Sequence, residues 1–240
     1  MGAVTIGVDL GQKRDPTAIA VVEAETRPRE GGGTDTHHLA RHLERLPLGT
    51  PYPDVARRVT TVVAGVAARG GGRPRLYVDA TGLGTPVVDV LRAGGVAADL
   101  IPTYFTYGDR RTEERGEVRL GKAWLVSQLQ ALLQTGRLHL PRTAEAEALA
   151  RELLDYEIRV SEGANDTYGA FRVGTHDDLV TALGLATQEG GAGFVIPHIP
   201  PPIGFVGESI WAGAGGSGVG SSWEPSAGGF GGPSGSGWGW

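Results

Sequence analysis

The chain has 240 residues, and its 22 basic and 27 acidic side chains give a formal net charge of −5, so any contact with nucleic acid must come from a local basic patch. Cysteine is absent, which excludes disulfide frameworks, thiolate nucleophiles and Cys-ligated zinc or iron–sulfur sites. No stretch approaches the roughly 18 consecutive apolar residues of a membrane span, and no secretory signal opens the chain. The sequence therefore predicts a soluble intracellular protein.

The first 200 residues alternate short strand and helix patterns. Strands are predicted over residues 4–9, 18–23, 38–46, 76–79 and 98–104, with a late hairpin over 156–160 and 168–173. Helices are predicted over 52–69, 87–91, 122–133, 144–154 and 179–187. Three strands come first and helix–strand alternation follows. We therefore expect an α/β fold with a mixed sheet, antiparallel in its first three strands and then parallel, flanked by helices on both faces.

Glycine is frequent, at 40 residues, and it concentrates at the end of the chain. Residues 203–240 are rich in Gly and Ser, contain no Lys or Arg and show no apolar period, so we expect disorder there. The tryptophans of this segment are either incidental or anchors for a partner. Because a proline-rich boundary spans 197–202, we predict one domain over 1–200 and a tail over 201–240.

Acidic residues stand at the ends of predicted elements. Asp9 ends the first strand and Asp79 ends the fourth, each on the face opposite the preceding valine. If these strands are parallel neighbours, both carboxylates meet at one carboxyl edge, where open α/β sheets place ligands. Asp177 and Asp178 open the last helix. Such a cluster resists burial unless cations neutralise it, and oxygen ligands suit Mg²⁺ or Mn²⁺, a pair of which can activate water in phosphodiester hydrolysis.

Each acid also has a structural interpretation. Asp9 and Asp79 both precede glycines within a few residues, so either could simply begin a turn. Thr175 and Asp178 fit a capping box at the start of the last helix, and an Asp in a first helical turn is favoured by the helix dipole. The joint pattern of the acids, rather than any one of them, therefore indicates a metal site.

Four segments carry a family resemblance: GVDLG with DPTA in 7–18, VDATGLG in 78–84, the leucine-rich helix 122–133, and HDDLVTAL in 176–183. Together they resemble the nuclease domain of large terminase subunits from tailed bacteriophages, which has a ribonuclease H-like fold. The resemblance spans about residues 4–188, and HDD…AL is its most specific part. A full large terminase also has an N-terminal ATPase motor. Because this chain starts on the nuclease pattern, we expect an excised domain or a split protein.

The resemblance implies an endonuclease that uses two divalent cations, Mg²⁺ or Mn²⁺. The implied metal ligands are Asp9, Asp79, Asp177 and Asp178. Asp9, Asp79 and Asp178 would be the catalytic set, and Asp15 would lie at the edge of the centre. His176 would orient water or bind a metal, unless it is only a partly exposed residue at a helix entrance.

The substrate implied by the resemblance is concatemeric double-stranded DNA, cut during genome packaging in the cytoplasm of the bacterial host. The implied partners are an ATPase motor domain or subunit and a portal protein, with no membrane. We expect Arg110, Arg111 and Lys122 to contact DNA phosphates, because aromatic residues adjoin them. Glutamates interleave with these arginines, which equally favours a solvated helix start.

Other functions remain open. Gly116–Ala123 nearly matches a P-loop, but Ala123 lacks the hydroxyl that would hold Mg²⁺. The actin and sugar-kinase group also opens with a strand, AspLeuGly and a hairpin, but such an ATPase needs a second subdomain. A further alternative is a non-catalytic DNA- or capsid-docking module with a vestigial site and a working Trp-bearing tail.

Overall fold

The structure, a computed structural model, describes residues 2–11, 15–70, 72–155, 157–160, 166–169 and 177–188. The predicted tail over 201–240, His176 and Thr175 lie outside the described residues, and the division at residue 200 stays a prediction.

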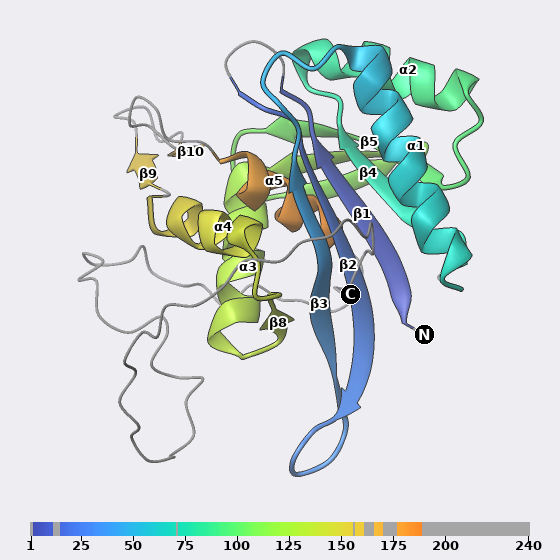
Figure 1. Ribbon diagram of the computed structural model, residues 1–240. Helices are drawn as coiled ribbons and strands as arrows, with labels where there is room; N and C mark the ends of the chain where they lie inside the picture. The colour runs from blue at the N-terminus through green and yellow to red at the C-terminus, as the bar shows by residue number, and fades with distance from the viewer. Residues whose placement is uncertain are drawn as a thin grey trace, which may run out of the picture. The chain divides into compact units, whose positions relative to one another are not determined.

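The described part of the chain contains one main sheet and a separate short hairpin (Figure 1). The main sheet has the strand order β6-β7-β5-β4-β1-β2-β3-β8. Its strands are β1 (Ala3–Asp9), β2 (Ala18–Pro28), β3 (Thr34–Arg45), β4 (Arg75–Asp79), β5 (Asp99–Thr106), β6 (Arg111–Glu114), β7 (Glu117–Gly121) and β8 (Leu138–His139). The short hairpin consists of β9 (Glu157–Val160) and β10 (Asp166–Gly169).

The helices match the predicted ones closely. They are α1 (Tyr52–Ala68), α2 (Thr85–Ala93), α3 (Lys122–Gln134), α4 (Ala144–Asp155) and α5 (Asp178–Ala186), with a short 3₁₀ turn at Gly82–Gly84. Among the residues that the structure describes, no helix combines the length and apolar character needed to cross a lipid bilayer.

The strand directions confirm the predicted mixed sheet. β1, β2 and β3 are antiparallel neighbours, whereas β1, β4, β5 and β7 run parallel to one another. The sequence interpretation did not include the strands at the two edges of the sheet. At one edge β6 pairs antiparallel with β7, and at the other the two-residue β8 pairs in parallel with β3.

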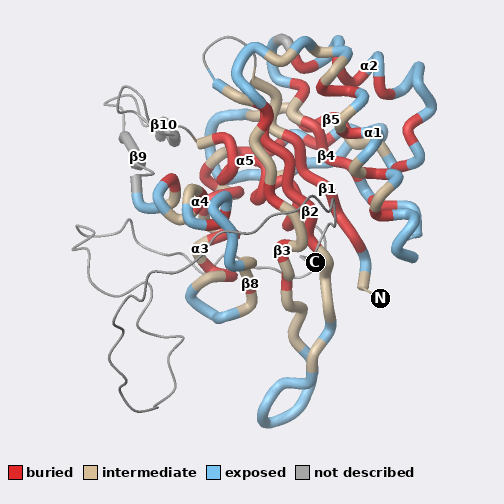
Figure 2. Tube along the Cα trace, in the orientation of Figure 1, coloured by how far each residue is buried: buried red, intermediate tan, exposed pale blue. Residues whose placement is uncertain are grey.

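Side-chain alternation along the strands separates two core layers, one on each face of the sheet. On β1, Val4, Ile6 and Val8 pack with the valines of α1 and α2, which recur at helical spacing. The opposite face, which includes Tyr77 of β4, packs against α3, α4 and α5. Figure 2 shows the buried centre of the sheet between these layers. The helices therefore flank the sheet on both faces, as predicted.

Helix α5 lies against β1 where that strand has a glycine. A Cβ atom on Gly7 would collide with the carbonyl oxygen of Ala182 and would lie 2.6 Å from the backbone nitrogen of Ala186. On the other side of the helix, a Cβ on Gly184 would collide with the side chain of Leu125 on α3. The two glycines thus let α5 lie close to both the sheet and α3.

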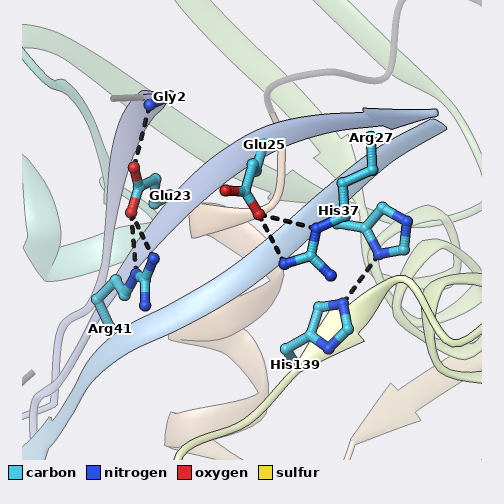
Figure 3. A network of polar contacts seen from close by, with 7 residues as sticks. All are labelled: Gly2, Glu23, Glu25, Arg27, His37, Arg41 and His139. Atoms are coloured by element: carbon cyan, nitrogen blue, oxygen red, sulfur yellow. Dashed lines mark hydrogen bonds and ion pairs between the residues drawn. The ribbon is translucent and has the colours of Figure 1, made fainter. Parts of the chain in front are cut away.

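The β2–β3 hairpin is longer than predicted. β2 continues to Pro28 and β3 begins at Thr34, so the turn is confined to the residues around Gly31–Gly33, whose φ angles are positive. We call residues 23–28 and 34–41 the hairpin arm. Polar pairs line it (Figure 3): Glu23 accepts hydrogen bonds from Arg41 and from the Gly2 backbone, and Arg27 pairs with Glu25.

The interpretation of the arginine-rich segment as a helix start is wrong. Residues 111–121 form the β6–β7 hairpin, with Arg115 and Gly116 at positive φ in its turn. The segment that resembles a P-loop is therefore a turn followed by an extended strand. Its backbone does not curl around a phosphate as a P-loop does.

Candidate active site

Asp9 and Asp79 end two neighbouring parallel strands. The register pairs Val8 with Val78, so the two aspartates follow side by side at the carboxyl edge of β1 and β4. Neighbouring strands are about 4.8 Å apart. Since Gly7 and Tyr77 face α5 and the helical layer around it, Asp9 and Asp79 lie on that same face.

Helix α5 brings the second pair of aspartates to this edge. Ala182 lies over Gly7, and Asp178 is one helical turn earlier, on the side of Asp9. Asp178 is only 2% exposed. The carboxylates of Asp79, Asp178 and Asp177 all act on Asp9 electrostatically, so the structure places the four aspartates together. We call Asp9, Asp79, Asp177 and Asp178 the carboxylate edge.

This clustering changes the acidity of the edge. Burial raises the pKa of Asp9 well above its usual range, the charges of Asp79 and Asp178 raise it further, Lys122 lowers it, and Asp177 raises it. Burial also raises the pKa of Asp79, against hydrogen bonds from Thr81 and the charge of Lys122. Negative charge is therefore held here at a cost in free energy.

Two threonines that the sequence interpretation did not single out organise the strand ends. The Thr81 backbone N–H donates to Asp79 Oδ1 at 2.8 Å, and Thr81 Oγ1 accepts from the Phe105 backbone N–H at 2.8 Å. Thr17 Oγ1 accepts from the Gly11 backbone N–H at 3.2 Å and donates to its carbonyl at 3.1 Å. Asp79 thus does begin a turn, in addition to facing Asp9. Thr17 lies in the DPTA motif and Thr81 in the DATG motif, and these two motifs were the sequence signal that could have identified them.

Lys122, at the start of α3, faces the carboxylate edge. Its Nζ lies 3.5 Å from Asp177 Oδ2 and 5.6 Å from the centroid of the Phe105 ring. This lysine also lowers the pKa of Asp9 and Asp79. The ammonium group of Lys122 thus offsets part of the negative charge of the aspartates.

The other residues expected near substrate are Arg110, Arg111 and Asp15. Arg110 is exposed, and its carbonyl accepts from the Gly121 backbone N–H at 2.8 Å, next to Lys122. Arg111 pairs with Glu113 at 3.0 Å, the kind of ion pair that the interleaved glutamates suggested. Asp15 is exposed in the chain that leads into β2. The roles of Arg110, Arg111 and Asp15 stay predictions.

The capping-box interpretation of the last helix is wrong. The N-cap residue of α5 is Asp177, not Thr175, and the Asp177 side chain makes no capping hydrogen bond. Glu152 of α4 takes that role, since its Oε2 accepts from the backbone N–H groups of Leu179 at 3.0 Å and Val180 at 3.1 Å. The sequence interpretation missed Glu152 because nothing local to α5 points to a residue 27 positions earlier.

The residues around this edge fit a hard divalent cation by their chemistry. The four aspartates supply only oxygen ligands, and Lys122 offsets only part of the rise that burial and the other aspartates cause in the pKa of Asp9. Within the described ranges, no three Asp, Glu or His side chains are arranged so as to hold one ion. The charge and donor type for a metal centre are therefore present, without a preformed cage.

No family model matches the chain, and no curated protein matches it. Among solved structures, the large terminase nuclease of thermophilic phage G20c is similar at a TM-score of 0.55 and 21% identity, over 78% of this chain and 82% of that one. The G20c nuclease is also known with bound magnesium and with bound cobalt.

Two further solved structures are similar. The large terminase nuclease domain of Thermus phage P74-26 has a TM-score of 0.51 and 20% identity, over 77% of each chain. The human cytomegalovirus terminase nuclease domain has a TM-score of 0.50 and 16% identity, over 77% of this chain and 82% of that one. The chain thus has the ribonuclease H-like fold of large terminase nuclease domains, which confirms the predicted fold class.

Proposed function

We propose that this protein is a metal-dependent endonuclease that hydrolyses phosphodiester bonds of double-stranded DNA at the carboxylate edge. The observation that carries the proposal is geometric: Asp9 and Asp79 end neighbouring parallel strands, and the start of α5 brings Asp177 and Asp178 to the same edge. A site that holds so much unfavourable charge is typical of metal centres and catalytic sites. The fold supports the same conclusion, as does the magnesium bound by the similar G20c nuclease.

Asp9, Asp79 and Asp178, with Asp177, would hold two divalent cations, Mg²⁺ or Mn²⁺. Such ions supply an activated water molecule and stabilise the leaving oxygen. The chain's own residues orient these ligands: Thr81 fixes the Asp79 carboxylate through its backbone N–H, and close packing at Gly7 sets the position of α5.

DNA binding would depend on those cations. The chain carries a net charge of −5 and its site is acidic, so DNA phosphates meet repulsion there until cations neutralise the edge. Lys122 lies at the site itself, and exposed Arg110, just before β6, accepts a backbone hydrogen bond from Gly121, the residue that precedes Lys122. These residues, with Arg111, would contact the DNA backbone next to the cleaved bond.

The biological setting that we propose is the cutting of concatemeric viral DNA during genome packaging in the host cytoplasm. An ATPase motor and a portal protein would then be the partners. This setting rests on the likeness of fold to phage large terminase nucleases.

The test is nicking of supercoiled plasmid in the presence of MnCl₂ or MgCl₂. We expect cleavage by the wild type and a loss on the order of 10³-fold or more in Asp9→Asn and Asp79→Asn, because several kcal/mol of charge stabilisation depend on the ions. The matched control is Asp99→Asn. Asp99 begins β5, at the opposite end of the parallel strands, where it pairs with Arg73 at 2.7 Å.

Circular dichroism would check that each variant folds. Wild-type rates in both Asp9→Asn and Asp79→Asn would overturn the proposal. A wild-type protein that binds plasmid and Mn²⁺ but never cuts would instead favour the non-catalytic docking module.

A further inference from the structure

A buried ion-pair network lies behind the carboxylate edge. Arg45, the last residue of β3, forms an ion pair with Glu152 Oε1 through its Nη2 and lies 3.3 Å from Asp178 Oδ2 through its Nε. The exposed fractions of the side chains are 29% for Arg45, 7% for Glu152 and 3% for Asp178. One guanidinium thus bridges two buried carboxylates that come from α4 and α5.

Glu152 makes a second contact to the same helix. Its Oε2 accepts from the first free N–H groups of α5, those of Leu179 and Val180. Helix N-termini are usually capped by a local Ser, Thr, Asp or Asn. Here Asp177 stands at the N-cap without capping and instead pairs with Lys122 at 3.5 Å. The cap from α4 therefore leaves Asp177 available to the carboxylate edge.

The two contacts together fix α5 where it meets the active site. Glu152 holds the backbone of the first helical turn, and Arg45 holds both Glu152 and the Asp178 carboxylate. A planar guanidinium that forms ion pairs on two sides restricts the rotation of both carboxylates, which a single ammonium cannot do. Burying these charges is costly, so a purely stabilising role would be served as well by apolar residues.

We propose that Arg45 and Glu152 are positioning residues, which orient the Asp178 carboxylate and the start of α5 for divalent-cation binding. This inference rests on the proposed function. Groups that hold the ligands of a metal typically contribute about 10- to 100-fold in metal affinity or activity. Simple electrostatics makes the opposite prediction for Arg45, since loss of a nearby positive charge would strengthen cation binding.

The experiment is a Mn²⁺ titration of the full chain, read both as the rise in melting temperature and by calorimetry. For Arg45→Gln and Glu152→Gln we expect the dissociation constant for Mn²⁺ to rise about 10- to 100-fold. Arg45→Lys should recover only part of the affinity, because one ammonium cannot contact both carboxylates.

The matched control is Arg41→Gln. Arg41 lies on the same strand and is also paired, with Glu23 at 2.8 Å, but it belongs to the hairpin arm (Figure 3). We expect its Mn²⁺ affinity to equal that of the wild type.

Wild-type or tighter Mn²⁺ binding in Arg45→Gln and Glu152→Gln would overturn the positioning role, and it would leave the proposed function intact if the wild type binds Mn²⁺ and cuts DNA. Absence of Mn²⁺ binding in the wild type would instead remove the proposed function. If Arg45→Gln does not fold, Arg45→Lys and Glu152→Gln decide the matter with the same titration.

Discussion

The carboxylate edge and the hairpin arm use the same kinds of charged residue in opposite ways. On the arm, carboxylates meet guanidinium groups: Glu23 with Arg41 at 2.8 Å, and Glu25 with Arg27 at 2.6 Å. At the edge, Asp9 meets the other aspartates instead. Paired charges of the first kind serve structure, whereas clustered acids of the second kind oppose folding and are typical of sites that bind a ligand.

The acidities of the two regions follow this contrast. A hydrogen bond from Arg27 lowers the pKa of Glu25 on the arm, whereas burial and neighbouring carboxylates raise the pKa of Asp9 at the edge. Both groups are carboxyls, and burial together with the charge of the neighbours sets the direction in which the pKa moves.

The largest loss of stability is expected where α5 packs against β1 of the sheet. Gly7→Ala places a methyl group against the Ala182 carbonyl oxygen, so α5 must move and take Asp178 with it. We expect a loss of about 3 kcal/mol in the free energy of unfolding and about 10²-fold in plasmid nicking. Urea unfolding and the nicking rate measure the two effects.

Gly65→Ala is the matched control for that substitution. Its Cβ would meet only Arg69 Nη1, at 3.4 Å on the surface of α1. We expect unchanged nicking and a gain of up to about 1 kcal/mol from helix propensity. Equal effects of Gly7→Ala and Gly65→Ala would show that the position of α5 does not depend on the absence of a side chain at Gly7.

A smaller effect is expected from pH, with opposite signs in the two regions. On the arm, burial with the charges of Arg137 and His37 lowers the pKa of His38 to about 4. The unfolded chain then binds the proton first, so stability is lost as pH falls below about 6.5. We expect His38 to cost about 2 kcal/mol between pH 7.5 and pH 5, a loss that His38→Gln removes.

Asp9 should change stability in the other direction as pH falls. Its pKa is raised in the folded state, so the folded protein binds the proton first and gains stability as pH falls through that pKa. Free energies of unfolding for wild type, His38→Gln and Asp9→Asn as a function of pH would separate the two contributions. Slopes of the same sign for both residues would contradict the contrast.

The smallest effect is expected from breaking a pair on the arm. Arg41 is partly exposed, and its bond to Glu23 is of the kind that contributes about 1 kcal/mol or less. Arg41→Gln should therefore lower stability by no more than that and leave nicking unchanged. A loss of nicking would mean that the arm takes part in catalysis.

Local patterns sufficed to predict the central strands, the helices and the meeting of Asp9 with Asp79, because strand ends and parallel pairing follow from alternation and connection length. The β6–β7 hairpin was missed because β6 has no apolar face, and because β7 offers only Val118 and Leu120 as an alternating apolar pair. Arg45 and Glu152 were missed for another reason. Their contacts to α5 join three elements distant in the chain, and no short-range pattern encodes them.

Melting temperatures of wild type and Asp9→Asn, with and without MnCl₂, test most directly whether Asp9 stands in an anionic site that a divalent cation stabilises. Without metal at neutral pH, Asp9→Asn should be the more stable protein, by roughly 1–3 kcal/mol, because it removes a partly buried carboxyl group that the neighbouring aspartates repel. With saturating Mn²⁺ the order should reverse, since only the wild type retains the full ligand set. A variant that is less stable than the wild type without metal, or that gains as much from Mn²⁺, would contradict the claim.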